Sequence, residues 1–372
     1  MRFYTKMVNS LTFKFLFLMM PICSSRVFKW LVAFVGVCIC VYFAGVVLCD
    51  APVARCVDDR TRLVVPLNGS SVYKFTEGVA KSEFGEHGFN KLHDSKSLDG
   101  GVIFLHGDSF VEALQVEDAK KPDIVLEKAL GSGTAVIGLG RSGTGLPTFI
   151  VHAEEYEKNF RIPKCHIFIV TSVIEDSLFD NGDEYQLTPK GLSCRIGAVS
   201  DRLLSVSRFI NRFHLNILIA CYARIGDVRN KKWRFWPAPK RSRTDTADVI
   251  GKDYFAERLE LLFAEMEANV KAPVVIAYCP NVPRLEKGEI RFDDLDWEYV
   301  QLFRRACEKH GVAFVDMTNV LKGLFESNGT FPRGFANSNR FGEGHFNVNG
   351  IEKVFSDIAD YVGGWDYDIQ FP

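Results

Sequence analysis

The chain has 372 residues, 47% of them hydrophobic, and a formal net charge of −1. Its length suits one or two domains, and its composition is typical of a globular core. The near-zero charge leaves no overall positive field, so it gives no indication of nucleic acid as a partner.

The first 49 residues have the pattern of a membrane anchor. Residues 31–49 contain no charged side chain, and their length is close to the roughly 20 apolar residues that span a bilayer. Residues 1–30 form a basic leader without an acidic residue, whereas both signs of charge follow position 49. The positive-inside tendency therefore predicts a cytoplasmic N-terminus, one transmembrane helix, and an extracytoplasmic (periplasmic or extracellular) remainder. The alternatives are a cleaved signal peptide, for which the run is long, and a buried core helix.

Residues 50–97 are polar and turn-rich and are predicted to be a linker or irregular lead-in. After them, apolar strands alternate with helical patterns, which predicts a parallel sheet with helices on both faces in a domain spanning 98–372. Strands are expected at 102–105, 135–137, 166–170, 273–278 and 312–315, and helices at about 118–130, 145–160 and 348–362.

An insertion is expected between the third and fourth strands, over residues 182–250. It begins with an apolar helix pattern. From Arg224 to Arg243 it then carries eight basic residues against one acid, with Trp233 and Trp236 among them. This mixture suits a membrane interface with anionic headgroups or stacking on an anionic glycan. A solvated insertion whose Trp rings pack on the domain remains equally open.

Ser109 directly follows the first predicted strand, behind Gly107 and Asp108. This position should lie at the carboxyl edge of the sheet, where open α/β folds bind their ligands. A glycine permits a sharp turn there, and backbone N–H groups of the following helix can stabilise an oxyanion. Ser109 is therefore the candidate nucleophile.

A glycine motif, Gly138-x-Gly140-x-x-Gly143, follows the second predicted strand. The same spacing occurs at dinucleotide sites, which also place an acid about 20 residues further on. Here the nearest strand-end acids, Glu175 and Asp176, come more than thirty residues after the motif. We therefore favour a different role, in which Gly140 offers its N–H at the same sheet edge as Ser109.

Near the C-terminus, Glu343-Gly344-His345 precedes the last predicted helix. A loop histidine with a carboxylate two residues earlier suits a general base and its orienting partner. The other histidines are interpreted as structural.

The order of these motifs along the chain resembles the SGNH hydrolase superfamily, also called GDSL-type hydrolases, over about residues 100–362. The acid-Gly-His form looks more like the branch of exported sugar O-acetyltransferases and esterases. The resemblance implies an α/β fold of the flavodoxin-like three-layer sandwich type. It also implies Ser109 as nucleophile and oxyanion donor, Gly140 as second donor, His345 as base and Glu343 as its orienter, with no cofactor or metal.

Two positions depart from the family pattern. The orienting acid is usually aspartate, and here it is Glu343. The family's third motif supplies an asparagine side chain to the oxyanion hole, whereas the matching position here is Glu175 or Asp176. An ionised carboxylate there would repel an oxyanion, and a protonated one could donate to it. Ser177 and Asn181 are alternative donors.

The sequence thus predicts a membrane-anchored serine esterase or O-acyltransferase acting on acylated glycan or lipid. The expected membrane contacts are residues 31–49 and the basic aromatic part of the insertion. The alternative, favoured by the altered third motif, is a weakly active or inactive relative that binds carbohydrate or a partner protein. A nucleotide-binding oxidoreductase would rest on the glycine motif alone.

Overall fold

The computed structural model describes residues 26–48, 53–74, 77–93, 101–131, 133–178, 185–188, 191–194, 209, 250–338 and 341–364. They belong to two compact units. One comprises residues 1–49 and 212–233, and the other comprises residues 50–211 and 234–372.

The first unit contains helix α2 (Arg26–Leu48), so the predicted transmembrane segment is helical through Leu48. Its window Arg26–Phe43 has a mean hydropathy of 1.9, which suffices by length and composition to cross a membrane. A signal sequence near an N-terminus has the same character. The orientation of the chain across a membrane stays a prediction.

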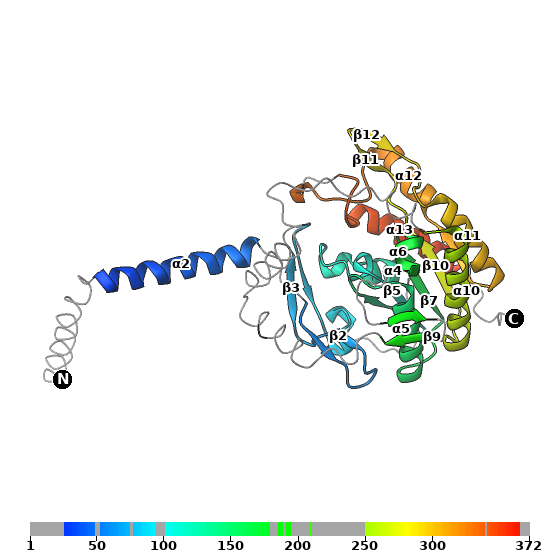
Figure 1. Ribbon diagram of the computed structural model, residues 1–372, viewed down its shortest axis with the longest axis horizontal. Coiled ribbons are helices and arrows are strands. Elements are labelled where there is room, and N and C mark those ends of the chain that lie inside the picture. The colour runs from blue at the N-terminus through cyan, green and yellow to red at the C-terminus, as the bar shows by residue number, and fades with distance from the viewer. Residues whose placement is uncertain are drawn as a thin grey trace. The chain divides into compact units, whose positions relative to one another are not determined.

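The second unit is built on a five-stranded parallel sheet (Figure 1). The strands lie side by side in the order β13 (Ala313–Asp316), β10 (Val274–Tyr278), β7 (Cys165–Val170), β5 (Gly101–Gly107) and β6 (Thr134–Gly140). Numbered along the chain, this is the order 2-1-3-4-5 of flavodoxin-like folds. The predicted α/β fold class and its five strands are confirmed.

Helices cover both faces of this sheet because its strands carry apolar side chains on both sides. In β5, Ile103 and Leu105 point into the core beneath α4 and α13, while Val102 and Phe104 point into the opposite side. Helices α5, α10 and α11 enclose a separate core around Phe168. The helices are α3 (Ser109–Glu112), α4 (Pro122–Leu130), α5 (Leu146–Asn159), α6 (Val173–Leu178), α10 (Lys252–Asn269), α11 (Trp297–Lys309), α12 (Thr318–Asn328) and α13 (Val348–Gly363).

The described part of residues 50–97 is not a linker, which corrects the prediction. It forms two antiparallel hairpins, one of β1 (Arg55–Val57) with β2 (Val64–Pro66) and one of β3 (Ser71–Lys74) with β4 (Ala80–Glu83). Leu63, Val65 and Phe89 pack against Phe104 of the sheet. The segment belongs to the domain because these few apolar side chains are buried, although its strands are too short to give a clear hydrophobic period.

Short elements complete the described chain. They are the 3₁₀ turns η1 (Glu86–Gly88), η2 (Lys91–His93), η3 (Asp118–Lys120) and η4 (Ala336–Ser338), and the hairpins β8 (Tyr185–Thr188)–β9 (Gly191–Cys194) and β11 (Arg284–Glu286)–β12 (Glu289–Arg291). Of the predicted insertion over 182–250, the structure describes this β8–β9 backbone, Phe209 and Ile250. The predicted apolar helix there and the basic aromatic stretch with Trp233 and Trp236 lie outside the described residues.

Candidate active site

Ser109 is the first residue of α3, at the carboxyl end of β5. Asp108 caps this helix, and its carboxylate accepts a hydrogen bond of 2.9 Å from the Phe110 amide, which fixes the turn that presents the serine. Burial raises the pKa of Asp108, against the opposing effects of this hydrogen bond and of the His345 and Arg333 charges. The Ser109 hydroxyl lies 3.5 Å from the Asp108 carboxylate, too far for a strong hydrogen bond.

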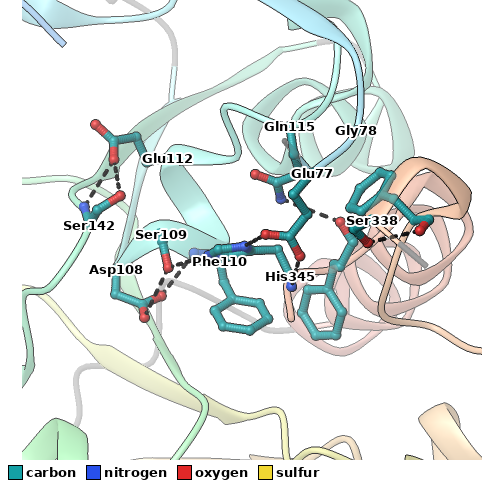
Figure 2. A network of polar contacts seen from close by, with 12 residues as sticks. Glu77, Gly78, Asp108, Ser109, Phe110, Glu112, Gln115, Ser142, Ser338 and His345 are labelled. Atoms are coloured by element: carbon teal, nitrogen blue, oxygen red, sulfur yellow. Dashed lines mark hydrogen bonds and ion pairs between the residues drawn. The ribbon is translucent and has the colours of Figure 1, made fainter. Parts of the chain in front are cut away.

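The structure brings His345 to Ser109. The imidazole Nε2 lies 2.8 Å from the serine Oγ, within hydrogen-bonding distance, although the two residues are 236 positions apart. His345 precedes α13, and its ring packs against Phe110 with ring centroids 5.2 Å apart. The turn after β5 and the loop before α13 thus bring the candidate nucleophile and the candidate base into contact (Figure 2).

The carboxylate that contacts the other side of the imidazole is Glu77. Its Oε2 lies 2.6 Å from His345 Nδ1, and its Oε1 accepts a 2.7 Å hydrogen bond from the His345 backbone N–H. Figure 2 shows Glu77, His345 and Ser109 linked in this order. The sequence prediction gave this role to Glu343, so the structure corrects it: Glu77, on the loop between β3 and β4, lies where Glu343 was expected.

Gly344 makes room for the Glu77 carboxylate beside His345. Its φ of +79° is left-handed, and a Cβ at this position would lie 2.2 Å from Glu77 Oε1. The side chain that Gly344 lacks therefore leaves the space that the Glu77 carboxylate fills. Gly344 therefore permits the close approach of a residue distant in sequence, Glu77.

The electrostatic environment keeps Glu77 ionised. Burial alone would raise the pKa of this carboxyl, but the hydrogen bonds and charge of His345, with a smaller contribution from Lys74, bring the pKa below its usual value. The carboxylate therefore stays charged and holds the proton of the imidazole on Nδ1, which leaves the Nε2 lone pair facing Ser109.

On the opposite side of Ser109, Gly140 ends β6 beside Gly107 and packs directly on α3. A Cβ on Gly140 would lie 1.9 Å from the Glu112 amide nitrogen, so a larger residue would push the two elements apart. The Gly140 position at the sheet edge is the predicted one. The role of its N–H as an oxyanion donor stays a prediction.

The third loop of the sheet edge offers carboxylates rather than an amide. Asp176 Oδ2 accepts hydrogen bonds from the backbone N–H groups of Thr171 at 2.7 Å and Ser172 at 3.1 Å. The Glu175 side chain is exposed. The Asp176 carboxylate thus accepts hydrogen bonds from the backbone of its own loop. Ser177 is buried and its hydroxyl has no hydrogen-bond partner among the described residues, while Asn181 lies outside them.

A parallel sheet in the order 2-1-3-4-5, with Ser, His and Glu converging near its carboxyl edge, defines a hydrolase-like α/β domain. No protein-family model matches the chain, and no curated protein does either.

Among solved structures, the chain is similar to a carbohydrate acetylesterase from Sinorhizobium meliloti, with 12% identity, a TM-score of 0.33, and coverage of 70% of this chain and 98% of that one. It is similar to a member of the lipolytic protein G-D-S-L family from Veillonella parvula, with 10% identity, a TM-score of 0.37, and coverage of 70% and 97%. It is also similar to an acetylxylan esterase from Geobacillus stearothermophilus, with 12% identity, a TM-score of 0.34, and coverage of 72% of this chain and 96% of that one. The second of these carries the G-D-S-L name of the family that the motif order resembles, and similarity at this level does not assign an activity.

Proposed function

We propose that this protein is a serine esterase or O-acyltransferase that forms a covalent acyl ester on Ser109. The observation that carries the proposal is the continuous contact from Glu77 through His345 to Ser109, with heavy-atom distances of 2.6 and 2.8 Å. These are the distances at which a base accepts a proton from a serine hydroxyl while a carboxylate orients the base.

The reaction begins when the Ser109 oxygen attacks the carbonyl carbon of an ester and passes its proton to His345 Nε2. Glu77 stabilises the imidazolium that forms, without taking its proton. His345 then gives the proton to the departing alkoxide as the ester bond breaks, which leaves an acyl-serine. Attack by water, deprotonated by the same imidazole, releases the acid. Attack by a sugar hydroxyl instead transfers the acyl group.

The negative oxygen of the tetrahedral intermediate needs hydrogen-bond donors at the opposite side of Ser109. The backbone N–H groups of Ser109 and Gly140 are the proposed donors. Because the third loop supplies no amide side chain among its described residues, the rate then depends on these two groups. One missing donor costs about 10²–10³ in rate in enzymes of this kind.

The proposed substrate is an acyl ester on a glycan or lipid, and the proposed location is the extracytoplasmic side of a membrane. Helix α2, apolar enough to span a bilayer, supports membrane attachment. The charge pattern around it supports a cytoplasmic N-terminus. The basic aromatic stretch of the insertion is proposed as a second contact with the membrane surface or with an anionic glycan.

The test is the Ser109→Ala variant of the full chain. The wild type should release p-nitrophenol from p-nitrophenyl acetate and react covalently with a fluorophosphonate probe, and the variant should do neither. Turnover that survives in Ser109→Ala would remove this residue from the nucleophile role.

The second candidate is a non-catalytic domain that binds carbohydrate or a partner protein, and the absence of an amide at Glu175 and Asp176 favours it. This candidate predicts that neither the wild type nor the variant reacts with the probe, while both bind acylated glycan fragments equally.

A further inference from the structure

The turn that follows β6 is tied to the helix that carries Ser109 by one buried carboxylate. Glu112 Oε2 accepts hydrogen bonds from both the backbone N–H of Ser142, at 3.0 Å, and the Ser142 hydroxyl. The Arg141 N–H donates to the Gly107 carbonyl at 2.9 Å, which fixes the start of the same turn to the end of β5. Figure 2 shows Glu112 reaching Ser142 beside Ser109.

The charge of Glu112 is balanced from a distant part of the chain. Arg55, in strand β1 of the first hairpin, lies 2.7 Å from Glu112 Oε1, and the side chain of Glu112 is only 2% exposed. Burial alone would raise the pKa of this carboxyl, but the Arg55 charge and the Ser142 hydrogen bonds bring it below its usual value. Glu112 is therefore an ionised, desolvated carboxylate, and Arg55 and Ser142 provide the contacts that water would otherwise make.

Gly140 lies at the contact between this turn and α3, the helix that begins with Ser109. It packs against the peptide between Val111 and Glu112, at a distance that admits no side chain. Ser109 is the first residue of α3, so a looser contact between the Ser142 turn and α3 would let the Ser109 backbone N–H shift. Backbone donors stabilise an oxyanion only when they are held in place before the charge develops.

We propose that Arg55, Glu112 and Ser142 are positioning residues that hold the turn after β6 against α3, so that the backbone N–H of Ser109 is kept in place for the oxyanion formed on its substrate. The inference rests on the proposed function. It makes the hairpin of β1 and β2 part of the catalytic apparatus, since Arg55 is what allows Glu112 to remain charged in a buried place.

The test removes the ion pair without leaving a buried charge. In the full chain, Arg55→Met is combined with Glu112→Leu, which keeps similar side-chain volumes while Ser142 loses its acceptor. Replacing both partners of a buried pair by apolar groups generally preserves stability. We expect kcat for p-nitrophenyl acetate to fall about 10- to 100-fold, below the cost of losing a donor outright, while KM changes less than about 2-fold.

Two further variants separate position from charge. The single variant Glu112→Gln keeps an oxygen acceptor for Ser142. Unlike the double variant, it should retain most of the wild-type kcat. Thr134→Val removes the hydroxyl that Lys164 contacts at 2.8 Å near the opposite end of β6, and should leave kcat unchanged. Amide hydrogen exchange of a peptide covering residues 140–145 should accelerate in the double variant, but not in Thr134→Val.

A folded double variant with wild-type kcat and unchanged exchange in residues 140–145 would overturn the inference and leave the proposed function standing. A wild type that neither turns over the ester nor reacts with the fluorophosphonate probe would overturn both. A loss of kcat in Thr134→Val equal to that in the double variant would show a general effect of loosening β6, and would also overturn the positioning role.

Discussion

The two sides of Ser109 are built in different ways. On the acid side, Glu77 and His345 are 268 residues apart and meet through two hydrogen bonds, to the imidazole and to the backbone. On the other side, Gly140 packs against the α3 backbone, Ser142 of the same turn donates to the Glu112 carboxylate, and the Asp176 carboxylate of the third loop accepts from its own amides. In the proposed reaction, activation of the nucleophile and stabilisation of the charge it creates thus depend on separate parts of the molecule, and we expect that they can be weakened independently.

The largest expected effect tests which carboxylate completes the acid side. Glu77→Gln should lower kcat on the order of 10³-fold, since the amide no longer stabilises the imidazolium or fixes its tautomer. Glu343→Gln is the matched control and should change kcat less than about 3-fold. Steady-state hydrolysis of p-nitrophenyl acetate measures both, and a larger loss in Glu343→Gln would return the orienting role to the acid adjacent in sequence.

The next effect concerns the space that the acid occupies. Gly344→Ala should lower kcat on the order of 10- to 100-fold and stability by about 2 kcal/mol, because the new methyl group meets Glu77 Oε1 in a left-handed backbone. Gly329→Ala is the control. Gly329 also has a left-handed φ, of +69°, but nothing lies within 4 Å of its Cβ position. Urea unfolding and kcat should separate strain, common to both variants, from displacement of Glu77, expected only in the first.

A third prediction concerns two buried histidines, His106 on β5 and His152 on α5. Burial lowers the pKa of His106 well below 6.5, and burial together with the charges of Arg141 and Arg55 lowers the pKa of His152 to about 3. These groups stay neutral in the folded chain and bind protons on unfolding, so stability is present above pH 6.5 and is lost as pH falls below it. For His152 the cost should be about 1.4 kcal/mol at pH 5.5 relative to pH 7.5.

Urea unfolding at the two pH values measures this loss, and His152→Leu should reduce it by about 1.4 kcal/mol. The same pH dependence in wild type and variant would show that His152 is protonated equally in both states. The carboxylate of Glu77 titrates at lower pH, so its contribution falls outside this window.

The smallest effect tests how the loop carrying Glu77 is held. The Asn337 side chain accepts a hydrogen bond from the Gly78 N–H at 3.0 Å and donates to the Gly78 carbonyl at 2.8 Å. Because this contact is near solvent, Asn337→Ala should lower kcat only about 3-fold. Ser338→Ala, which removes a hydrogen bond within the same 3₁₀ turn, should have no effect. Equal losses in the two variants would assign the effect to the turn itself.

The sequence predicted what local patterns encode. Strands such as residues 165–170 are fully buried runs, and the order of Ser109, Gly140 and His345 along alternating strands and helices placed all three at one edge of the sheet. The identity of the orienting acid could not be predicted in the same way. Glu77 lies between two four-residue strands, in a segment without a strong hydrophobic period, and its contact with His345 depends on the fold of the whole domain.

The loop after β7 is a second place where the sequence alone does not determine which side chain faces the candidate site. The sequence pattern assigned Glu175 or Asp176 to the position of an amide in the family pattern, and this assignment stays a prediction. Which of them faces the reacting atoms depends on how the loop after β7 bends. In the structure Asp176 satisfies the amides of Thr171 and Ser172 while Glu175 points to solvent, a division that spacing alone does not contain.

The long separation between Glu77 and His345 also orders events during biosynthesis. A ribosome makes the acid first, then the serine, and the base only 236 residues after the serine. The loop before α13 must then find the β3–β4 hairpin, a contact of high sequence separation that forms late in folding. A nascent chain therefore carries its serine without a base. In the proposed reaction, Ser109 gains its base only when the two far-apart regions have docked, so we expect a chain that stalls before α13 to be unable to acylate its own serine.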